Sequence, residues 1–312
     1  MTRTVLVTGA NGLLGAQCVA ALAKDSGCKI IAVWHKGSER LQTNPQPNVV
    51  YVQCDISDAE AVRQVFAREH IDTILHTAAL LPDASAAYDS IAVLANVAAT
   101  VNLAAAGRDS GCDCFIYCSS VSVYGSTSVA GLTFSEDMLP IPEDVYAWTK
   151  LAGEQYLQLC CAQSAMHGIC LRLSGLHGPG RRAGLLYNVV RAAKTGAPIH
   201  IASANAPFQF LYTGDAVKLI LHALHLPAKN MTGYMTLNAA SCITPSLYDI
   251  AAEAVRMSGN NSSIVVGETE SARHQIMNTG RQATWFTPPT YGVAETFHAM
   301  SEWLDTIEEF AP

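Results

Sequence analysis

The stretch VTGANGLLGAQ, Val7 to Gln17, follows an apolar run and places three glycines three residues apart. The apolar run TVLVT (4–8) predicts a strand, and the segment after the glycines predicts a helix. In such a unit Gly9 allows the tight turn, Gly12 lets a pyrophosphate approach, and Gly15 lets the helix pack on the strand. The stretch therefore predicts a dinucleotide site on the helix N-terminus, with a glycine-rich turn that binds no ligand as the alternative.

The first half of the chain repeats this alternation of strands and helices. Further apolar strands are expected at 29–34, 48–54, 73–77, 114–119 and 168–174. Helices are expected at about 13–25, 58–68, 86–108 and 145–166. Continuous apolar strands that alternate with helices indicate a parallel sheet covered on both faces. We therefore predict an α/β fold with a Rossmann-type doubly wound parallel sheet and a smaller C-terminal substrate-binding lobe.

The regular alternation ends after the strand at 168–174. A strand at 208–212, a helix at 215–226 and a closing helix at about 292–310 are expected beyond it. We predict a dinucleotide-binding domain over 1–174, to which 208–226 returns. The substrate-binding lobe is expected to comprise 175–207 and 227–312.

Composition limits the classes of partner. Of the 312 residues, 50% are hydrophobic and 14% are charged, and the net charge is −7. Acidic and basic residues are interspersed along the chain. This argues against nucleic acid or an anionic membrane as the main partner, because phosphate binding needs clustered Lys and Arg. The ten cysteines lack the spacing of a zinc site, so no metal is predicted, and we interpret them as reduced buried thiols. With no signal-peptide pattern and no membrane-length apolar segment, a cytoplasmic protein is expected.

The end of the second predicted strand bears on the choice of cofactor. Acids usually stand there in NAD-preferring folds, to bind the ribose hydroxyls. Here His35, Lys36 and Arg40 follow the strand, and they could meet the 2′-phosphate of NADP. NADP (NADPH) is therefore favoured and NAD is the alternative, unless these bases are merely solvated. Asp55 is expected to accept from the adenine amino group, or else to cap the next helix, where Asp58 is also available.

Two further stretches carry groups suited to proton transfer. CSSVSVYG (118–125) ends a predicted strand, and YAWTK (146–150) begins a predicted helix. Tyr146 and Lys150 are four residues apart and so share one helix face. A nearby ammonium lowers the pKa of a phenol, which lets it exchange a proton near neutrality. The hydroxyl of Ser120 would complete a polar grip on a carbonyl or alcohol oxygen.

In this order the motifs resemble the extended short-chain dehydrogenase/reductase family, in particular its nucleotide-sugar epimerases, dehydratases and reductases. The resemblance covers nearly the whole chain. It rests on TGANGLLG (8–15), Asp55-Ile56, HTAA (76–79), SSVSVYG (119–125), Tyr146 with Lys150, LHGPG (176–180), FLYTGDAV (210–217) and YGVAETFHAMSEWL (291–304).

The resemblance assigns roles to positions of this chain. It implies that Ser120, Tyr146 and Lys150 are the catalytic residues. The expected cofactor contacts, including those inferred above, are Gly9, Asn11, Gly12, Leu13, Leu14, Gly15, His35, Lys36, Arg40, Asp55, Ile56, Thr77, Ala78, Ala79, Tyr146 and Lys150. It also implies a homodimer formed through the helices at 86–108 and 145–166.

Departures from the family pattern narrow the reaction. Dehydratases of the family have two acids just after the serine, where this chain has Val121 and Ser122, so dehydration is not expected. Reduction of a sugar ketone with NADPH is favoured by the bases after the second strand, with Tyr146 as general acid. The alternative is a nucleotide-sugar epimerase that retains its NAD.

The substrate site is expected to involve Ser122, Ser174, Arg181 and Phe208. Many relatives have Asn at Ser174 and often Arg at Phe208, which weakens the nucleotide-sugar assignment. Arg181 and its neighbour Arg182 could supply the phosphate contacts, or they could be solvated. A ketoreductase of a small apolar carbonyl, lined by aromatic side chains, is therefore a second alternative. An NADP-sensing regulator is a third, although such proteins commonly lack the Tyr/Lys pair.

Overall fold

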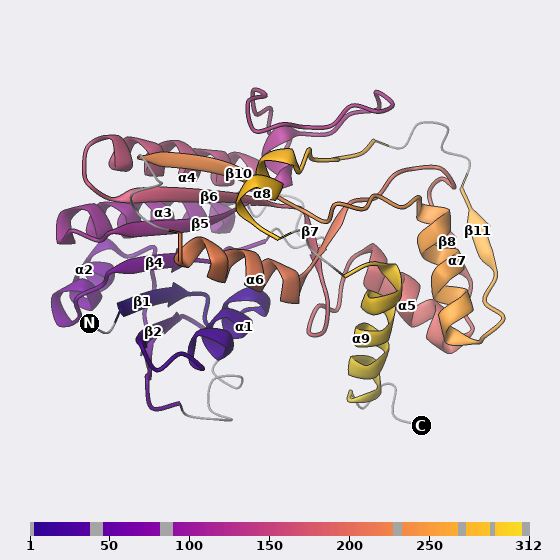
Figure 1. The fold of residues 1–312 in the computed structure, drawn as a ribbon, viewed down its shortest axis with the longest axis horizontal. Coiled ribbons are helices and arrows are strands. Elements are labelled where there is room, and N and C mark those ends of the chain that lie inside the picture. The colour runs from indigo at the N-terminus through magenta and orange to yellow at the C-terminus, as the bar shows by residue number, and fades with distance from the viewer. Residues whose placement is uncertain are drawn as a thin grey trace. The chain divides into compact units, whose positions relative to one another are not determined.

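The computed structural model describes residues 3–37, 46–81, 90–226, 233–267, 273–287 and 291–307. The chain divides into two compact units (Figure 1). Unit 1 comprises Met1–Gly125, Leu139–Arg172 and Val217–Leu237, and unit 2 comprises Ser126–Met138, Leu173–Ala216 and Asn238–Pro312. These bounds differ from the expected division, because 126–138 groups with unit 2 and 217–237 returns to unit 1.

A seven-stranded sheet is built from the described residues, in the order β10-β6-β5-β4-β1-β2-β3. The strands are β1 (Arg3–Thr8), β2 (Cys28–Trp34), β3 (Val49–Gln53), β4 (Thr73–His76), β5 (Cys114–Ser120), β6 (His167–Leu173) and β10 (Tyr234–Ala239). β1 pairs in parallel with β2 on one side and with β4 on the other. The strand order reverses between β1 and β4, which is where doubly wound sheets bind ligands. The predicted doubly wound α/β fold is confirmed.

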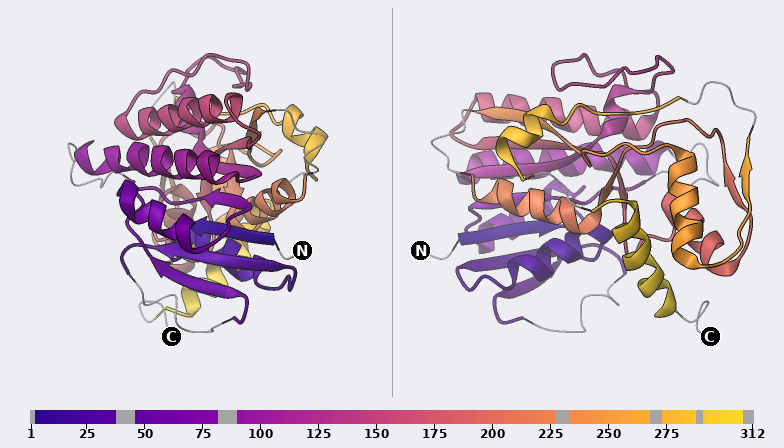
Figure 2. Two further views of the ribbon diagram at one scale, coloured as in Figure 1. Left: turned by 90° about the vertical axis from the view of Figure 1, so that its left-hand side faces the viewer. Right: turned by 45° about the vertical axis from the view of Figure 1, so that its right-hand side comes forward.

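Helices pack on both faces of this sheet (Figure 2). One face is covered by α2 (Ala59–Arg68), α3 (Ser90–Ser110) and α4 (Val145–Ala162), whose apolar side chains share a core with β1, β2, β4 and β5. α1 (Leu13–Leu22) buries Leu14, Cys18, Val19 and Leu22. Its Cys18 lies close enough to Cys118 of β5 for the two thiols to interact, whereas the neighbouring Tyr117 belongs to the core under α2–α4. Because successive strand residues face opposite sides, α1 covers the other face.

Several elements differ in extent from the prediction. α4 ends at Ala162 and not at Met166, because Ser164 turns back to donate to the carbonyl of Cys160 at 2.8 Å. α3 runs on to Ser110, and its expected start at 86–89 lies outside the described residues. The predicted strand 208–212 shortens to β9 (Phe210–Tyr212). The strand β10 was not predicted.

Unit 2 is built around three mutually packed helices, α5 (Leu185–Thr195), α7 (Leu247–Ser258) and α9 (Val293–Asp305). Their core includes Val189, Phe210, Ile250 and Met300. Two short parallel pairs accompany them: β8 (Ile199–Ile201) with β11 (Ile264–Val266), and β7 (Gly175–His177) with β9. The remaining helices of the described chain are α6 (Thr213–Leu224), α8 (Gly280–Trp285) and a 3-10 turn, η1 (Val121–Tyr124).

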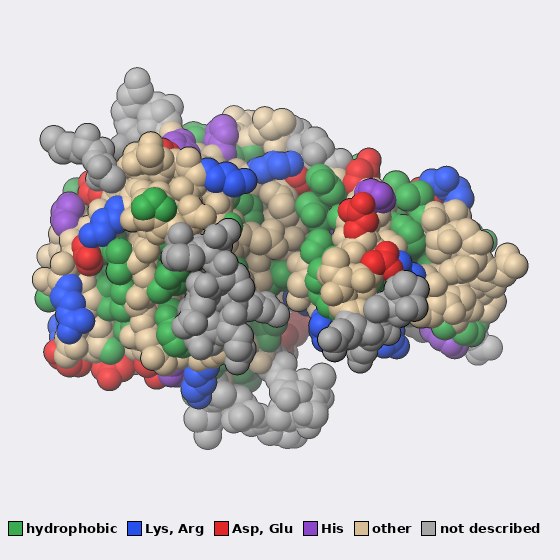
Figure 3. All heavy atoms as spheres, turned by 90° about the horizontal axis from the view of Figure 1, so that it is seen from below, with side chains coloured by type: hydrophobic (Ala, Val, Ile, Leu, Met, Phe, Trp, Pro, Cys, Tyr) green, Lys and Arg blue, Asp and Glu red, His purple; other side chains and the backbone are tan. Residues whose placement is uncertain are grey.

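The surface and the cysteines show how polar groups are distributed. On the face drawn in Figure 3, basic side chains are scattered among acidic ones. All ten cysteines lie in the described ranges and are free, and all except Cys242 are buried. Within those ranges no helix combines the length and apolar character that a membrane crossing requires. Nor do they contain a group of three or more His, Cys, Asp or Glu side chains placed to hold a metal ion.

Candidate active site

The glycine turn after β1 has the backbone geometry that only glycine tolerates easily. Gly9 has a φ of +67°, in the left-handed region, and its carbonyl accepts from the N–H of Gly12 at 2.8 Å. A Cβ on Gly15 would lie 2.1 Å from the same carbonyl oxygen and 2.8 Å from Oγ1 of Thr77. Helix α1 therefore packs directly on the turn through Gly15.

The N-terminus of α1 has no capping side chain. Its N-cap is Gly12, no side chain hydrogen-bonds there, and the first turn contains no acid. By contrast, Asp58 caps α2 and Asp144 caps α4 by accepting backbone N–H groups. Gly12 is exposed, and the nearest atom to a Cβ placed on it would be the Gly9 carbonyl oxygen at 3.1 Å. This helix start thus presents unpaired N–H groups and a positive dipole end, which suit a phosphate.

The loop after β2 is tied to the glycine turn. The Asn11 side-chain amide donates to the carbonyls of Lys36 and Gly37, the latter at 2.8 Å. His35 Nε2 lies 3.8 Å from a carboxylate oxygen of Asp55, and both side chains are about half exposed. Arg40 lies outside the described residues.

Asp55 does not cap α2, because Asp58 performs that role by accepting from Glu60 N and Ala61 N. Instead Asp55 accepts from the hydroxyl and the backbone N–H of Ser57, at 2.6 and 2.9 Å. These two hydrogen bonds are the main reason that the pKa of Asp55 is lowered, so the carboxylate stays ionised. Its neighbour Ile56 is held through its carbonyl by the side chain of Asn102 at 3.1 Å.

The end of β4 packs against the glycine turn. Thr77 donates to the carbonyl of Thr8 at 2.7 Å, and the Ala78 N–H donates to Oγ1 of Thr8 at 3.3 Å. A Cβ on Gly9 would lie only 2.9 Å from Cα of Ala78. Ala79 follows on the exposed side of this segment. The glycine turn with Gly9 and the segment Thr77–Ala79, both predicted to contact the cofactor, therefore lie side by side.

His76 is a buried residue of this region that was not among the predicted site residues. It lies between Thr8 Oγ1, 2.7 Å from Nδ1, and Thr100 Oγ1, 3.1 Å from Nε2. Burial, followed by the charge of Lys150, lowers the pKa of His76 to about 3, so its ring is neutral. In the sequence, this buried contact between strands is marked by a histidine within an otherwise apolar strand.

Ser120 ends β5 and starts the turn η1. Its Oγ accepts from the N–H of Ser122 at 3.2 Å and from the Ser122 hydroxyl at 2.8 Å. Since both contacts use the oxygen of Ser120 as acceptor, its own hydroxyl proton can be donated to another acceptor. This arrangement leaves the Ser120 hydroxyl proton available for a substrate oxygen.

Lys150 lies in the first half of α4, one turn after Tyr146. Its ammonium is 2% exposed, donates to the Cys118 carbonyl at 2.8 Å, and lies 4.9 Å from the ring centre of Tyr117. The ring centre of Tyr146 is 5.9 Å away. Burial lowers the pKa of Lys150 to about 8, which leaves it charged at neutral pH. A buried cation beside a partly exposed phenol is an arrangement that favours the phenolate.

Three of the predicted substrate residues belong to unit 2. Arg181 and Phe208 line the same cavity of about 80 Å³, together with His177 and the start of α5. Phe208 lies outside β9 because its N–H donates to Pro245 O at 2.9 Å, while its ring is 6.3 Å from that of Phe210. Ser174 is 4% exposed and does not line this cavity. Unit 2 therefore brings Arg181 and Phe208 together but not Ser174.

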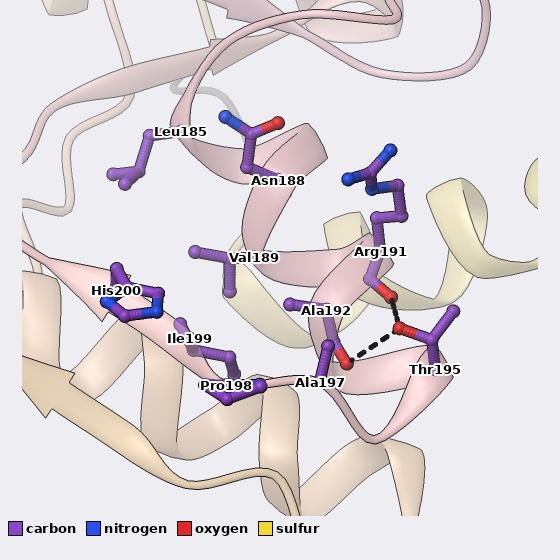
Figure 4. Close-up of a pocket in the computed structure, with 10 residues that line it drawn as sticks. All are labelled: Leu185, Asn188, Val189, Arg191, Ala192, Thr195, Ala197, Pro198, Ile199 and His200. Carbon is purple, nitrogen blue, oxygen red and sulfur yellow. Dashed lines mark hydrogen bonds between the residues drawn. The ribbon is translucent and has the colours of Figure 1, made fainter.

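A larger hollow of about 540 Å³ lies beside α5 and β8 (Figure 4). Leu185, Val189 and Ala192 supply apolar surface, and Asn188, Arg191 and His200 supply polar groups. None of the residues that line this hollow belongs to the predicted site.

A model of the NAD dependent epimerase/dehydratase family matches residues 5–238. A UDP-glucose 4-epimerase of Vibrio cholerae is 27% identical over 206 residues, which are 65% of this chain and 60% of that protein. A 3 beta-hydroxysteroid dehydrogenase/Delta 5→4-isomerase of Mycobacterium tuberculosis is 34% identical over 188 residues, 56% of this chain and 48% of that protein. The match thus spans about half to three fifths of these relatives.

The fold also matches solved structures over nearly its whole length. UDP-glucuronic acid 4-epimerase from Bacillus cereus, in complex with UDP-glucuronic acid and NAD, superposes with a TM-score of 0.82. The alignment covers 96% of this chain and 98% of that one, at 23% identity. At this identity the likeness concerns the fold.

Proposed function

Because the chain belongs to the NAD dependent epimerase/dehydratase family, we propose that it is an NAD-dependent epimerase that oxidises and re-reduces one carbon of a nucleotide-linked sugar. The family match over 5–238 confirms the family predicted from the motifs. The observation that carries the proposal is the buried Lys150 ammonium, 5.9 Å from the Tyr146 ring and bonded to the strand that ends in Ser120. The epimerases among the similar proteins support this reaction over net reduction.

The described residues fit a dinucleotide. The uncapped start of α1 suits the pyrophosphate, and the absence of a side chain at Gly12 leaves room for it. Asp55, kept ionised by Ser57, suits the adenine amino group. When bound, NAD supplies reversible transfer of a hydride to and from the substrate carbon.

The residues that follow β2 favour NAD over NADP as the cofactor. His35 and Lys36 are exposed, as a contact to a 2′-phosphate would require. However, the ionised Asp55 lies 3.8 Å from His35 Nε2, and its negative charge would repel a 2′-phosphate bound beside His35. NADP preference and net reduction with NADPH therefore form the secondary proposal, tested by the same measurement below.

Proton transfer is assigned to Tyr146. As a phenolate stabilised by Lys150, it takes the proton of a sugar hydroxyl during oxidation and returns it during reduction. Ser120, held as a donor by Ser122, hydrogen-bonds the same oxygen in both directions. The positions after Ser120 are Val121 and Ser122, neither of which can act as a general acid for loss of water.

The decisive experiment is to denature the purified protein and to identify and quantify the released nucleotide. Near-stoichiometric NAD is expected, because an epimerase regenerates its oxidised cofactor in each cycle. Released NADP(H), or an empty protein that turns over keto-sugars with NADPH, would overturn the epimerase in favour of the reductase. No nucleotide and no binding of either cofactor would refute both.

Substitution of the proposed acid–base residue provides the second test. Tyr146→Phe should lower kcat by about 10²- to 10⁴-fold, the usual contribution of general acid–base catalysis. The amount of bound nucleotide should stay close to that of wild type, because phenylalanine keeps the aromatic ring and the uncapped start of α1 is unchanged. A variant that retains full epimerisation of UDP-sugars would contradict the assigned role.

A second candidate function is oxidation or reduction of an apolar alcohol or ketone. It is favoured by Phe208, whose position often holds Arg in nucleotide-sugar enzymes, and by the 34% identity to a hydroxysteroid dehydrogenase. Steady-state assays that pair NAD with UDP-sugars and with a steroid alcohol separate the two candidates. Turnover of the steroid alone would replace the sugar proposal.

We also propose that two copies associate through α3 and α4. Both helices carry exposed apolar side chains, including Leu94 (44%), Trp148 (50%) and Leu159 (58%). Light scattering should give the mass of a dimer, and Trp148→Asp should give a monomer. A monomeric wild-type protein would exclude this association.

A further inference from the structure

A buried ion pair joins the middle of α4 to β6. Arg172 donates from Nε to both carboxylate oxygens of Glu154, at 3.1 and 3.2 Å, and from Nη2 to Oε2 at 2.6 Å. The two side chains are only 6% and 4% exposed. Burial alone would lower the pKa of Arg172, but Glu154 outweighs it and raises the pKa, so the guanidinium stays charged.

Each member of the pair contacts one end of the segment that contains Ser120. Glu154 accepts the hydroxyl of Ser119. The guanidinium of Arg172 lies over the ring of Tyr124, with 4.6 Å from Cζ to the ring centre. Ser119 directly precedes Ser120, and Tyr124 ends the turn that Ser120 begins. The ion pair therefore contacts the chain on both sides of Ser120, through Ser119 before it and Tyr124 after it.

Glu154 also lies on the same face of α4 as the proton-transfer residues. Tyr146, Lys150 and Glu154 follow one another at four-residue intervals along α4, and so occupy one helix face. The contact between Glu154 and Ser119 thus fixes the turn against the same face of the helix that carries the phenol and the ammonium. Ser120 and Tyr146 come from different elements, and this contact holds those elements together.

Burying two charges is costly, and well-packed apolar side chains can often replace a buried pair without loss of stability. What apolar side chains cannot supply is a directed acceptor for Ser119 or a planar cation over Tyr124. We propose that Glu154 and Arg172 are positioning residues, which orient the Ser120 hydroxyl toward the oxygen that Tyr146 protonates and deprotonates. The expected effect on turnover rests on the proposed function, whereas the effect on the turn does not.

The test compares a double variant that removes both charges with the single variant Arg172→Met. Arg172→Met leaves Glu154 as a lone buried charge and should lower Tm, whereas Glu154→Leu with Arg172→Met, which removes both the acceptor for Ser119 and the cation over Tyr124, should regain most of that loss. If the pair only stabilises the fold, the double variant regains activity as well. If it positions Ser120, kcat of the double variant stays at least about 10-fold below wild type, with KM and nucleotide binding within about twofold. Glu60→Leu with Arg63→Met, which removes an exposed pair on α2, is the matched control.

A second readout needs no substrate. Hydrogen exchange at the amides of Ser122 and Gly125, which donate to Ser120 Oγ and to the Ser122 carbonyl, reports on the turn. In the double variant these amides should exchange at least about 10-fold faster, while those of β1 and β2 stay protected. Unchanged exchange with wild-type kcat would overturn the proposal.

Failure of the proposed function remains distinguishable from failure of this inference. If wild type turns over no nucleotide sugar, the epimerase proposal fails, but exchange of the two turn amides still decides whether the pair orders the turn. Should the double variant not fold, Ser119→Ala removes only the hydroxyl that Glu154 accepts. Faster exchange of Ser122 in that variant supports the inference, and wild-type exchange refutes it.

Discussion

Replacement of Lys150 by methionine is expected to stabilise the protein at neutral pH while abolishing turnover. Burial lowers the pKa of this lysine from 10.5 to about 8. At about 1.4 kcal/mol per unit, the charged form costs the fold about 3 kcal/mol. Methionine removes that cost but leaves the Cys118 carbonyl without its donor, which takes back about 1–2 kcal/mol. The net gain is about 1–2 kcal/mol, equivalent to a rise in Tm of roughly 2–3 °C for a protein of this size.

The pH dependence gives the sharper test of this reasoning. Between pH 8 and 10.5 the native lysine has lost its proton while the unfolded one keeps it, so wild-type stability rises with pH relative to the variant. The advantage of Lys150→Met should therefore shrink by about 1.4 kcal/mol per pH unit over this range. Titrations of other groups cancel, because both proteins share them.

Urea unfolding of both proteins at pH 7, 8.5 and 9.5 measures this difference. Lys29→Met is the control, since Lys29 is half exposed in a pair with Glu69, and should change stability by about 1 kcal/mol or less. A Lys150→Met protein that is less stable than wild type at pH 7, or an advantage that does not vary with pH, would refute the argument that a buried ammonium is held at a cost.

Two further predictions concern the glycine turn and the buried histidines. Alanine at Gly15 would place its Cβ 2.1 Å from the Gly9 carbonyl oxygen, so thermal unfolding should show a loss of about 1–3 kcal/mol. Alanine at Gly12 should leave Tm nearly unchanged but weaken NAD binding at least about 10-fold by calorimetry, and the reverse pattern would contradict the assigned roles. Burial lowers the pKa of His76 to about 3 and that of His177 to about 4. The neutral rings therefore contribute fully to the free energy of unfolding above about pH 6.5, and this contribution is lost as the pH falls. Urea unfolding from pH 7 to 4.5 should show, below about pH 6.5, a loss of about 1.4 kcal/mol per pH unit for each histidine, and His76→Gln should flatten this dependence.

The sequence predicted the parts of the fold whose signals are local. β1, β2 and β4 to β6 are continuous apolar runs, and the glycine spacing identifies the turn after β1 without any tertiary information. Tyr146 and Lys150 could be paired because helical spacing alone puts them on one face. Thr77 and Ala78 were expected near the cofactor only from the family resemblance, and the pairing of β4 with β1 is what brings them against the turn.

The parts that escaped prediction depend on distant contacts. Phe208 looked like a strand residue, but its N–H bonds to Pro245, and the side chain of Gln209 bonds to Ser241 and Met277. β10 is a strand only because β6 lies beside it. The Glu154–Arg172 pair did leave a signal, an arginine inside the apolar run GICLRLS and a glutamate four residues after Lys150.

The return of the chain to unit 1 has a consequence for biosynthesis. β6 ends at Leu173, but the strand that covers its outer side, β10, begins only at Tyr234. At about 5–20 residues per second, several seconds of translation separate the two strands. Throughout that interval the nascent sheet has an open apolar edge at β6, the kind of edge that recruits other chains. The sheet can therefore be completed only after most of unit 2's first half has been synthesised, so the β6 edge stays exposed to other chains for the whole of that interval.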